Sequence, residues 1–209
     1  MMNENKKGLR ITAGVLLLVI AVFSLAASAY SLVTVYSASG YMSEYYRQAW
    51  QPVAAGVLGI VAAILILAKK FTGAGIVRCL ILAVSAAVHL LSIVPRFSGM
   101  PDLQSLTSAM PQLLLWTADL VPAILLIVAL FLHNRTSKPL LIVGAILALV
   151  LSIGQLAQTY APIVKQVVSS HDIYGIGLSV GLTLSTAIVT MVAWLLLAAY
   201  FGAQKPAEQ

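Results

Sequence analysis

The chain has 209 residues, of which 61% are apolar and only 9% are charged. Soluble domains carry about 25% charged residues because their surfaces must be hydrated, so this composition excludes an ordinary soluble domain and indicates an integral membrane protein. The net charge of +6 does not indicate a nucleic-acid partner, since the basic residues flank apolar runs and form no cluster interleaved with aromatics.

Six apolar runs are long enough to cross the hydrocarbon of a bilayer, which takes about 20 helical residues. They are continuously apolar rather than alternating, and lipid requires every backbone group to bond within its own segment, so each run is predicted to be a helix. The sequence therefore predicts an all-α integral membrane protein, a bundle of six transmembrane helices in one domain, residues 11–201. The spans are 11–36, 50–68, 75–95, 111–133, 139–164 and 174–201, flanked by an N-terminal segment, 1–10, and a tail, 202–209.

The first span has an alternative reading. A basic start, an apolar stretch and Ala27-Ser28-Ala29 also match a cleavable signal peptide. The apolar run continues to Tyr36, which is longer than the apolar region of most signal peptides, so we keep six spans. Cleavage would leave five spans with the same orientation.

The two short connections, 69–74 and 134–138, predict that spans two and three, and spans four and five, form antiparallel hairpins in contact. Each hairpin has a proline at its expected outer entrance, Pro52 and Pro111. The longer connection 37–49 carries Tyr41 and Tyr45 at helical spacing. The sequence leaves open whether these form a short helix on the membrane surface or only an aromatic belt.

Basic residues set the predicted orientation. Nine of the twelve Lys and Arg side chains fall on the side of both chain termini, and this bias places the termini in the cytoplasm. The expected location is the plasma membrane, the inner membrane if the source is a bacterium, in multi-pass form. Arg78 lies about one turn inside the third span, where its long stem is expected to reach the cytoplasmic head groups.

Polar residues inside spans are the candidate functional residues, because each is costly in hydrocarbon. His89, Asp119 and Gln155, from spans three, four and five, fall in one layer of the outer leaflet when depth is counted at about 1.5 Å per residue. We predict that they form a ligand-binding pocket, with Asp119 as its formal charge and His89 as partner. Such a pair can bind a cationic or hydrogen-bonding solute, or pass a proton. The alternative is a structural bond between packed helices. Other polar residues at comparable depth are Ser28, Tyr30, Thr183, Ser185 and Thr186.

No catalytic role is predicted. Gly177, Ser179 and Gly181 match the Gly-x-Ser-x-Gly nucleophile pattern, but that pattern has its meaning on a strand, turn and helix, whereas here it opens a membrane helix. The same glycines are a Gly-x-x-x-Gly pair that favours close helix packing. The single cysteine, Cys79, and three scattered histidines predict no metal site and no disulfide, and no cofactor is expected.

The predicted function is binding or translocation of a small solute, by the chain itself or as the membrane subunit of a transporter. The alternative is a non-catalytic accessory or scaffold protein whose small residues, such as Gly56 and Gly59, pack against a partner membrane protein. Expected partners are the lipid bilayer, a small solute, and a second copy or another membrane protein. By architecture alone the chain resembles the substrate-binding subunits of vitamin-uptake transporters, but their Ala-x-x-x-Ala pairing in the first helix is only approximated by Ser24-x-x-x-Ser28, so we do not assign that family.

Overall fold

The computed structural model describes the backbone of residues 2–39, 44–98, 103–167 and 173–204, and the side chains of residues 5–34, 37, 50–88, 117–159 and 180–204. Within these ranges the chain is all-helical, with six helices and no strands. The helices are α1 (Met2–Ser39), α2 (Glu44–Leu67), α3 (Phe71–Ser98), α4 (Leu103–Leu132), α5 (Ser137–Val167) and α6 (Ile173–Gly202).

Five of the helices are long and apolar enough to cross a membrane, judged on their described residues. These are α1, α2, α3, α5 and α6; in α4 the described side chains form a shorter apolar stretch, Thr117–Leu132, within a helix of 30 residues. Large apolar side chains such as Val121, Val150 and Ile153 point outward and are about half exposed. Because lipid rather than water suits such a surface, the chain is a multi-pass membrane protein.

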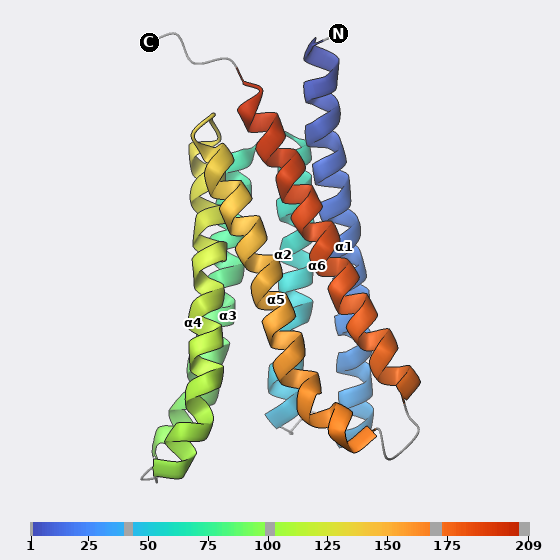
Figure 1. Cartoon of the computed structure of the whole chain (residues 1–209), viewed down its shortest axis with the longest axis vertical. Coiled ribbons are helices and arrows are strands. Elements are labelled where there is room, and N and C mark those ends of the chain that lie inside the picture. Colours follow the sequence, from blue (N-terminus) through green and yellow to red (C-terminus); the bar gives the residue numbers. More distant parts are fainter. Residues whose placement is uncertain (1, 40–43, 99–102, 168–172, 205–209) are drawn as a thin grey trace.

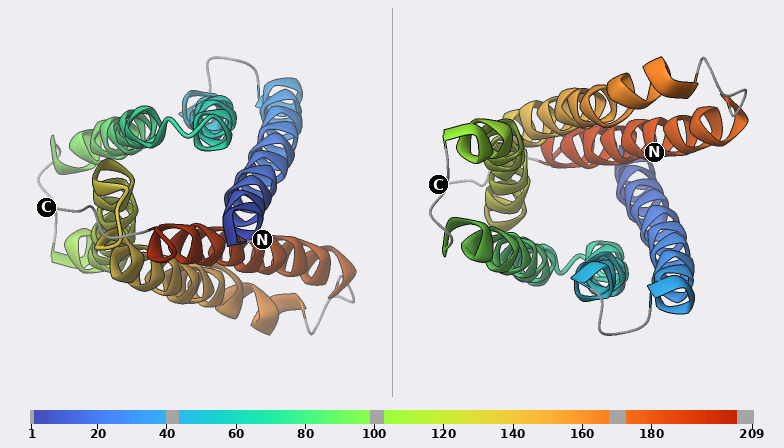
Figure 2. Two further views of the ribbon diagram at one scale, coloured as in Figure 1. Left: turned by 90° about the horizontal axis from the view of Figure 1, so that it is seen from above. Right: turned by 90° about the horizontal axis from the view of Figure 1, so that it is seen from below.

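The helices form a closed ring in chain order. Backbone contacts in the described residues join each helix to the next, and α6 returns to contact α1. Both predicted hairpins, α2 with α3 and α4 with α5, are confirmed. Figure 2 shows the six ribbons arranged around a common axis. In Figure 1 the described ends of α1 and α6 lie at the same end of the ring as the α2–α3 and α4–α5 turns.

Both turns at this end use a left-handed residue to stop a helix. Lys69 (φ 59°) follows α2, and His133 (φ 36°) follows α4. After α2 the Lys70 N–H donates to the Leu65 carbonyl at 2.8 Å, which satisfies an end carbonyl of the helix. The buried Arg10 of α1 donates to two further carbonyls at the same helix end, those of Ile66 (3.2 Å) and Leu67. Arg10, a basic residue near the start of the first predicted span, therefore also joins α1 to α2.

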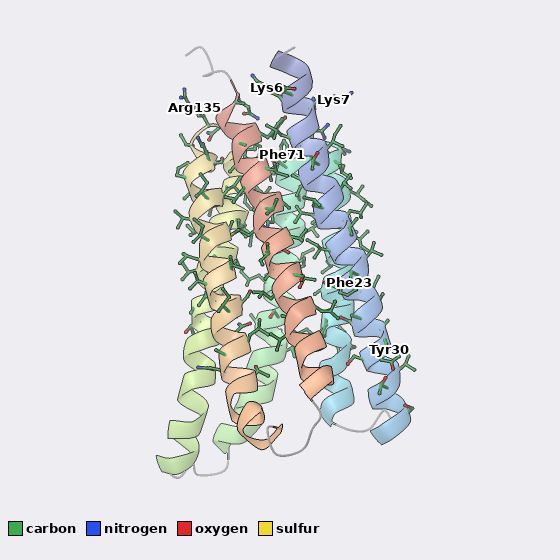
Figure 3. All side chains as sticks on the ribbon, turned by 45° about the vertical axis from the view of Figure 1, so that its right-hand side comes forward. Lys6, Lys7, Phe23, Tyr30, Phe71 and Arg135 are labelled. Atoms are coloured by element: carbon green, nitrogen blue, oxygen red, sulfur yellow. The ribbon has the colours of Figure 1, made fainter. Side chains whose placement is uncertain are left out.

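The buried core occupies the half of the ring that holds these turns, which we call the terminal half. Its members include Leu17, Ile66, Phe71, Leu130 and Phe201, and every helix contributes. Figure 3 shows Phe71 in this half, below Lys6, Lys7 and Arg135 at the end of the bundle. We call the other half the open half. Its described residues are 22–34, 50–61, 76–88, 117–125, 146–159 and 180–192, and among them only Gly56 and Pro122 are buried.

The helices extend further than the predicted spans at several ends. Residue Pro52 lies inside α2, and Pro111 lies inside α4, eight residues after Leu103. Both helices therefore begin about two turns before the prolines that were expected at the entrances of the hairpins. Both helices absorb a proline within the helical run, and the missing donor removes one backbone bond without ending the helix.

Candidate functional site

Four polar side chains of the open half share the inward face of their helices. A spacing of seven residues is almost two helical turns, so it keeps two side chains on one face. This spacing relates polar residues of the open half to buried residues of the terminal half: Ser24 to Leu17, Asp119 to Leu126, Ser152 to Ala145, and Thr190 to Leu197. The open half therefore continues the core face of the ring with polar groups in place of apolar ones.

Asp119 and Gln155 meet between α4 and α5. The Gln155 Nε2 donates a hydrogen bond to the Asp119 Oδ2, so two of the three predicted site residues are in contact. Asp119 is partly buried, three residues before the buried Pro122 on the same helix face. The side chain of the third predicted residue, His89, lies outside the described residues. The depth count placed Asp119 and Gln155, 36 positions apart in the chain, in one layer, but it named His89 rather than Gln155 as the partner of Asp119.

A cavity of about 230 Å³ lies between α1, α5 and α6, and neither Asp119 nor Gln155 is among its lining residues. Hydroxyl groups from all three helices line it, and its apolar lining includes Leu149, Met191 and Trp194. Gln155 follows Ser152 by three residues, about 4.5 Å of helical rise, on the same face of α5. The Asp119–Gln155 bond therefore lies about one turn beyond the part of α5 that lines the cavity. The hydroxyl-bearing residues of the lining are Ser24, Ser152, Thr183, Thr186 and Thr190.

Aromatic side chains fill the ring below the cavity, toward the terminal half. The buried Trp194 lines the cavity, and the guanidinium carbon of Arg78 lies 5.0 Å from the centre of its ring. One layer further, Phe71 and Phe201 pack edge to face with their ring centres 4.9 Å apart. The terminal half is thus packed with large rings where the open half is hollow.

The position of Arg78 corrects a prediction. The side chain was expected to extend to the head groups, but it turns into the ring over Trp194, and its Nε is buried without a hydrogen-bond partner. The reason is helical phase, since Arg78 lies seven residues after the buried Phe71. In place of head groups, the guanidinium contacts the face of an aromatic ring, which attracts a cation.

For some of the other polar residues, depth in the membrane did not predict which way the side chain points. Tyr30 has the expected depth but is 76% exposed on the outer face of α1, as Figure 3 shows, and Ser185 is exposed on α6. Thr183 and Thr186 do line the cavity, whereas Ser28 is not part of its lining.

The sequence analysis also missed a second polar bridge. Gln51 Nε2 of α2 donates to Ser85 Oγ of α3 at 3.1 Å. Gln51 is the second residue of the predicted span 50–68, but α2 begins at Glu44, which places this side chain two turns inside the helix. Extending each apolar run into its flanking polar residues would have found it.

The glycines of α2 serve contacts inside the chain. A Cβ on Gly56 would lie 3.0 Å from the Cα of Leu25, and one on Gly59 would lie 3.3 Å from the Cβ of Ala21. The two helices approach this closely because glycine has no side chain. By contrast, Gly181 of the Gly-x-x-x-Gly pair has open space where its Cβ would be, and the side chain of Ser179 lies outside the described residues.

Known proteins offer no further assignment. Comparison with protein-family models, with curated proteins and with solved structures finds no match to this chain. Among the side chains that the structure describes, no three His, Cys, Asp or Glu residues gather where they could hold a metal ion. The geometry of the open half is therefore the observation on which a function must be based.

Proposed function

We propose that this protein binds or translocates a small solute through the open half of the helix ring, without a catalytic role, in the plasma membrane and with both termini in the cytoplasm. One observation carries the proposal: hydroxyl groups from α1, α5 and α6 line one cavity, and the Asp119–Gln155 bond lies about one helical turn beyond Ser152 of that lining. Ligand sites are mainly apolar with a few placed polar groups, and this cavity, whose mainly apolar lining carries hydroxyl groups from three helices, fits that description.

The asymmetry of the ring supports this reading. A purely structural bundle gains by packing its interior along its full length, because van der Waals contact is the main force between membrane helices. Here Trp194, Phe71 and Phe201 fill one half, whereas polar groups face inward in the other. Under the proposed topology the cavity lies on the outer side of an aromatic floor, so a solute enters from outside the cell.

The alternative of an accessory or scaffold protein relied on small residues that could receive a partner. Gly56 and Gly59 are close to α1 of the same chain, so they give that alternative no support. A structural role for the Asp119–Gln155 bond remains the competing explanation, and the experiment must separate it from a binding role.

The test is a panel of small solutes, including amines, amino acids, carboxylates, sugars and nucleosides, added to the purified protein in lipid nanodiscs. A ligand of the site raises the unfolding temperature of the wild type and loses this effect in Asp119→Asn and Gln155→Leu. Gln158→Leu is the matched control, since Gln158 is, like Gln155, an exposed glutamine of α5 but lies one turn further from the cavity. The proposal is wrong if stabilisation by every solute survives in both site variants.

A further inference from the structure

Three of the five hydroxyl groups that line the cavity, those of Ser152, Thr186 and Thr190, donate their protons to carbonyls of their own helices. The Ser152 Oγ donates to the Ala148 carbonyl at 2.8 Å, the Thr186 Oγ1 to the Thr183 carbonyl at 2.8 Å, and the Thr190 Oγ1 to the Thr186 carbonyl at 2.7 Å. A hydroxyl has one proton to donate and two lone pairs to accept with. Once the proton is used, the oxygen can offer a ligand only acceptor capacity.

The lining carries no positively charged side chain. The twelve lining residues include no Lys, Arg or His. The carboxylate of Asp119 lies outside the lining, where it accepts a hydrogen bond from Gln155, about one turn beyond Ser152 on α5. The polar groups on this side of the cavity therefore favour a ligand that donates hydrogen bonds and carries positive charge.

The end of the cavity nearest the terminal half, its floor, is apolar. Trp194, Leu149 and Met191 present apolar surface, and the guanidinium of Arg78 lies over the ring of Trp194 without lining the cavity itself. A cationic head group is repelled from this end, so it points toward Ser152, Thr186 and the Asp119–Gln155 pair. An alkyl body then lies against the apolar floor. At about 30 Å³ for each water-sized group, the cavity accommodates about eight such groups.

From these observations we infer that the cavity between α1, α5 and α6 binds a small organic ammonium ion, whose N–H groups donate to the oxygens of Ser152, Thr186 and Thr190 and whose charge faces Asp119. The inference rests on the proposed function and specifies its ligand class. A bare alkali cation shares the preference for oxygen acceptors, but it would leave most of the cavity and its apolar floor unused.

Trp194 supplies the readout, because it lines the cavity. With Trp50 and Trp116 changed to Phe, its fluorescence is titrated with n-butylammonium chloride, and in parallel with sodium butyrate, 1-butanol and sodium chloride. We expect a saturable change with butylammonium alone. In Thr186→Val/Thr190→Val the apparent Kd rises by about tenfold or more for each hydroxyl lost, since a hydrogen bond to a charged group is being removed.

Two control variants distinguish a loss of folding from a loss of binding. Thr186→Ser/Thr190→Ser retains both hydroxyls and should bind butylammonium nearly as the parent does. Thr34→Val removes the same kind of back-bonded hydroxyl, Thr34 Oγ1 to the Tyr30 carbonyl at 2.9 Å, from an exposed position outside the cavity, and should leave binding unchanged.

The outcomes separate this inference from the proposed function. If butyrate or butanol binds in a manner that depends on Thr186 and Thr190, or if sodium chloride reproduces the effect, the ammonium class is wrong while the site stands. If butylammonium binding survives the valine variants, or if no probe changes the fluorescence of Trp194, the inference is overturned. The solute panel with the Asp119 and Gln155 variants then decides the proposed function independently.

Discussion

The contact between α1 and α2 at Gly56 allows the sharpest stability prediction. In Gly56→Ala the new Cβ would lie 3.0 Å from both the Cα and the Cβ of Leu25 and 3.2 Å from its backbone nitrogen. These atoms belong to a helix backbone, so they can move away only if the two helices separate. Overpacking of this kind costs about 1–3 kcal/mol. The same substitution gains about 1 kcal/mol of helix propensity, which partly offsets the cost.

Gly154→Ala is the matched control, because Gly154 lies within α5 and its added Cβ would meet nothing within 4 Å. Both variants gain the propensity term, so the difference between them isolates the packing cost, about 1–3 kcal/mol. The assay is reversible unfolding by sodium dodecyl sulfate in mixed micelles, followed by circular dichroism. We expect Gly56→Ala to be less stable than Gly154→Ala by this amount. Equal stability of the two variants would refute the close approach of α1 and α2.

Two further predictions use the same assay. Arg10→Met removes the donors to the carbonyls at the end of α2 but keeps an apolar stem, and we expect the free energy of unfolding to fall by about 1–3 kcal/mol. Lys7→Met, at an exposed position, should change this free energy little. Similar losses for both variants would show that only the positive charge matters, and not the hydrogen bonds of Arg10. Trp194→Ala empties the floor of the cavity and removes the partner of Arg78, so we expect a loss of about 3–5 kcal/mol. Trp50→Ala, at a residue 47% exposed, should change stability far less, and an equal loss would contradict the buried floor.

Much of the architecture follows from composition and spacing. Long apolar runs have only one backbone solution in lipid, and short connections such as 134–138 force neighbouring helices to pair. The contact between Asp119 and Gln155 was also predictable, since two polar side chains at equal depth on adjacent antiparallel helices lower their cost by bonding to each other.

What the sequence could not supply is rotation about each helix axis. Tyr30 and Thr186 have comparable predicted depths, yet one points outward and the other lines the cavity. Arg78 was assigned to the head groups because its depth permits it, but the phase that it shares with Phe71 turns it inward. Apolar residues surround membrane helices on all sides, so hydrophobic periodicity, which orients helices in soluble proteins, is weak here. The seven-residue spacing between buried and polar residues can be recognised only once the buried face of each helix is known.

The central claim is that water reaches the inward face of the open half, and cysteine accessibility tests it most directly. In a Cys79→Ser background, Ser152→Cys places a thiol in the cavity and Ile153→Cys places one at the same depth on the outer face, where Ile153 is 47% exposed. A charged, membrane-impermeant methanethiosulfonate reagent reacts only with a thiolate, and a thiolate forms in water but not in hydrocarbon. In intact cells we predict rapid modification of Ser152→Cys and none of Ile153→Cys. If Ser152→Cys remains unmodified in open membrane fragments, where both faces meet the reagent, yet reacts after denaturation, the cavity is closed to water and the account is wrong.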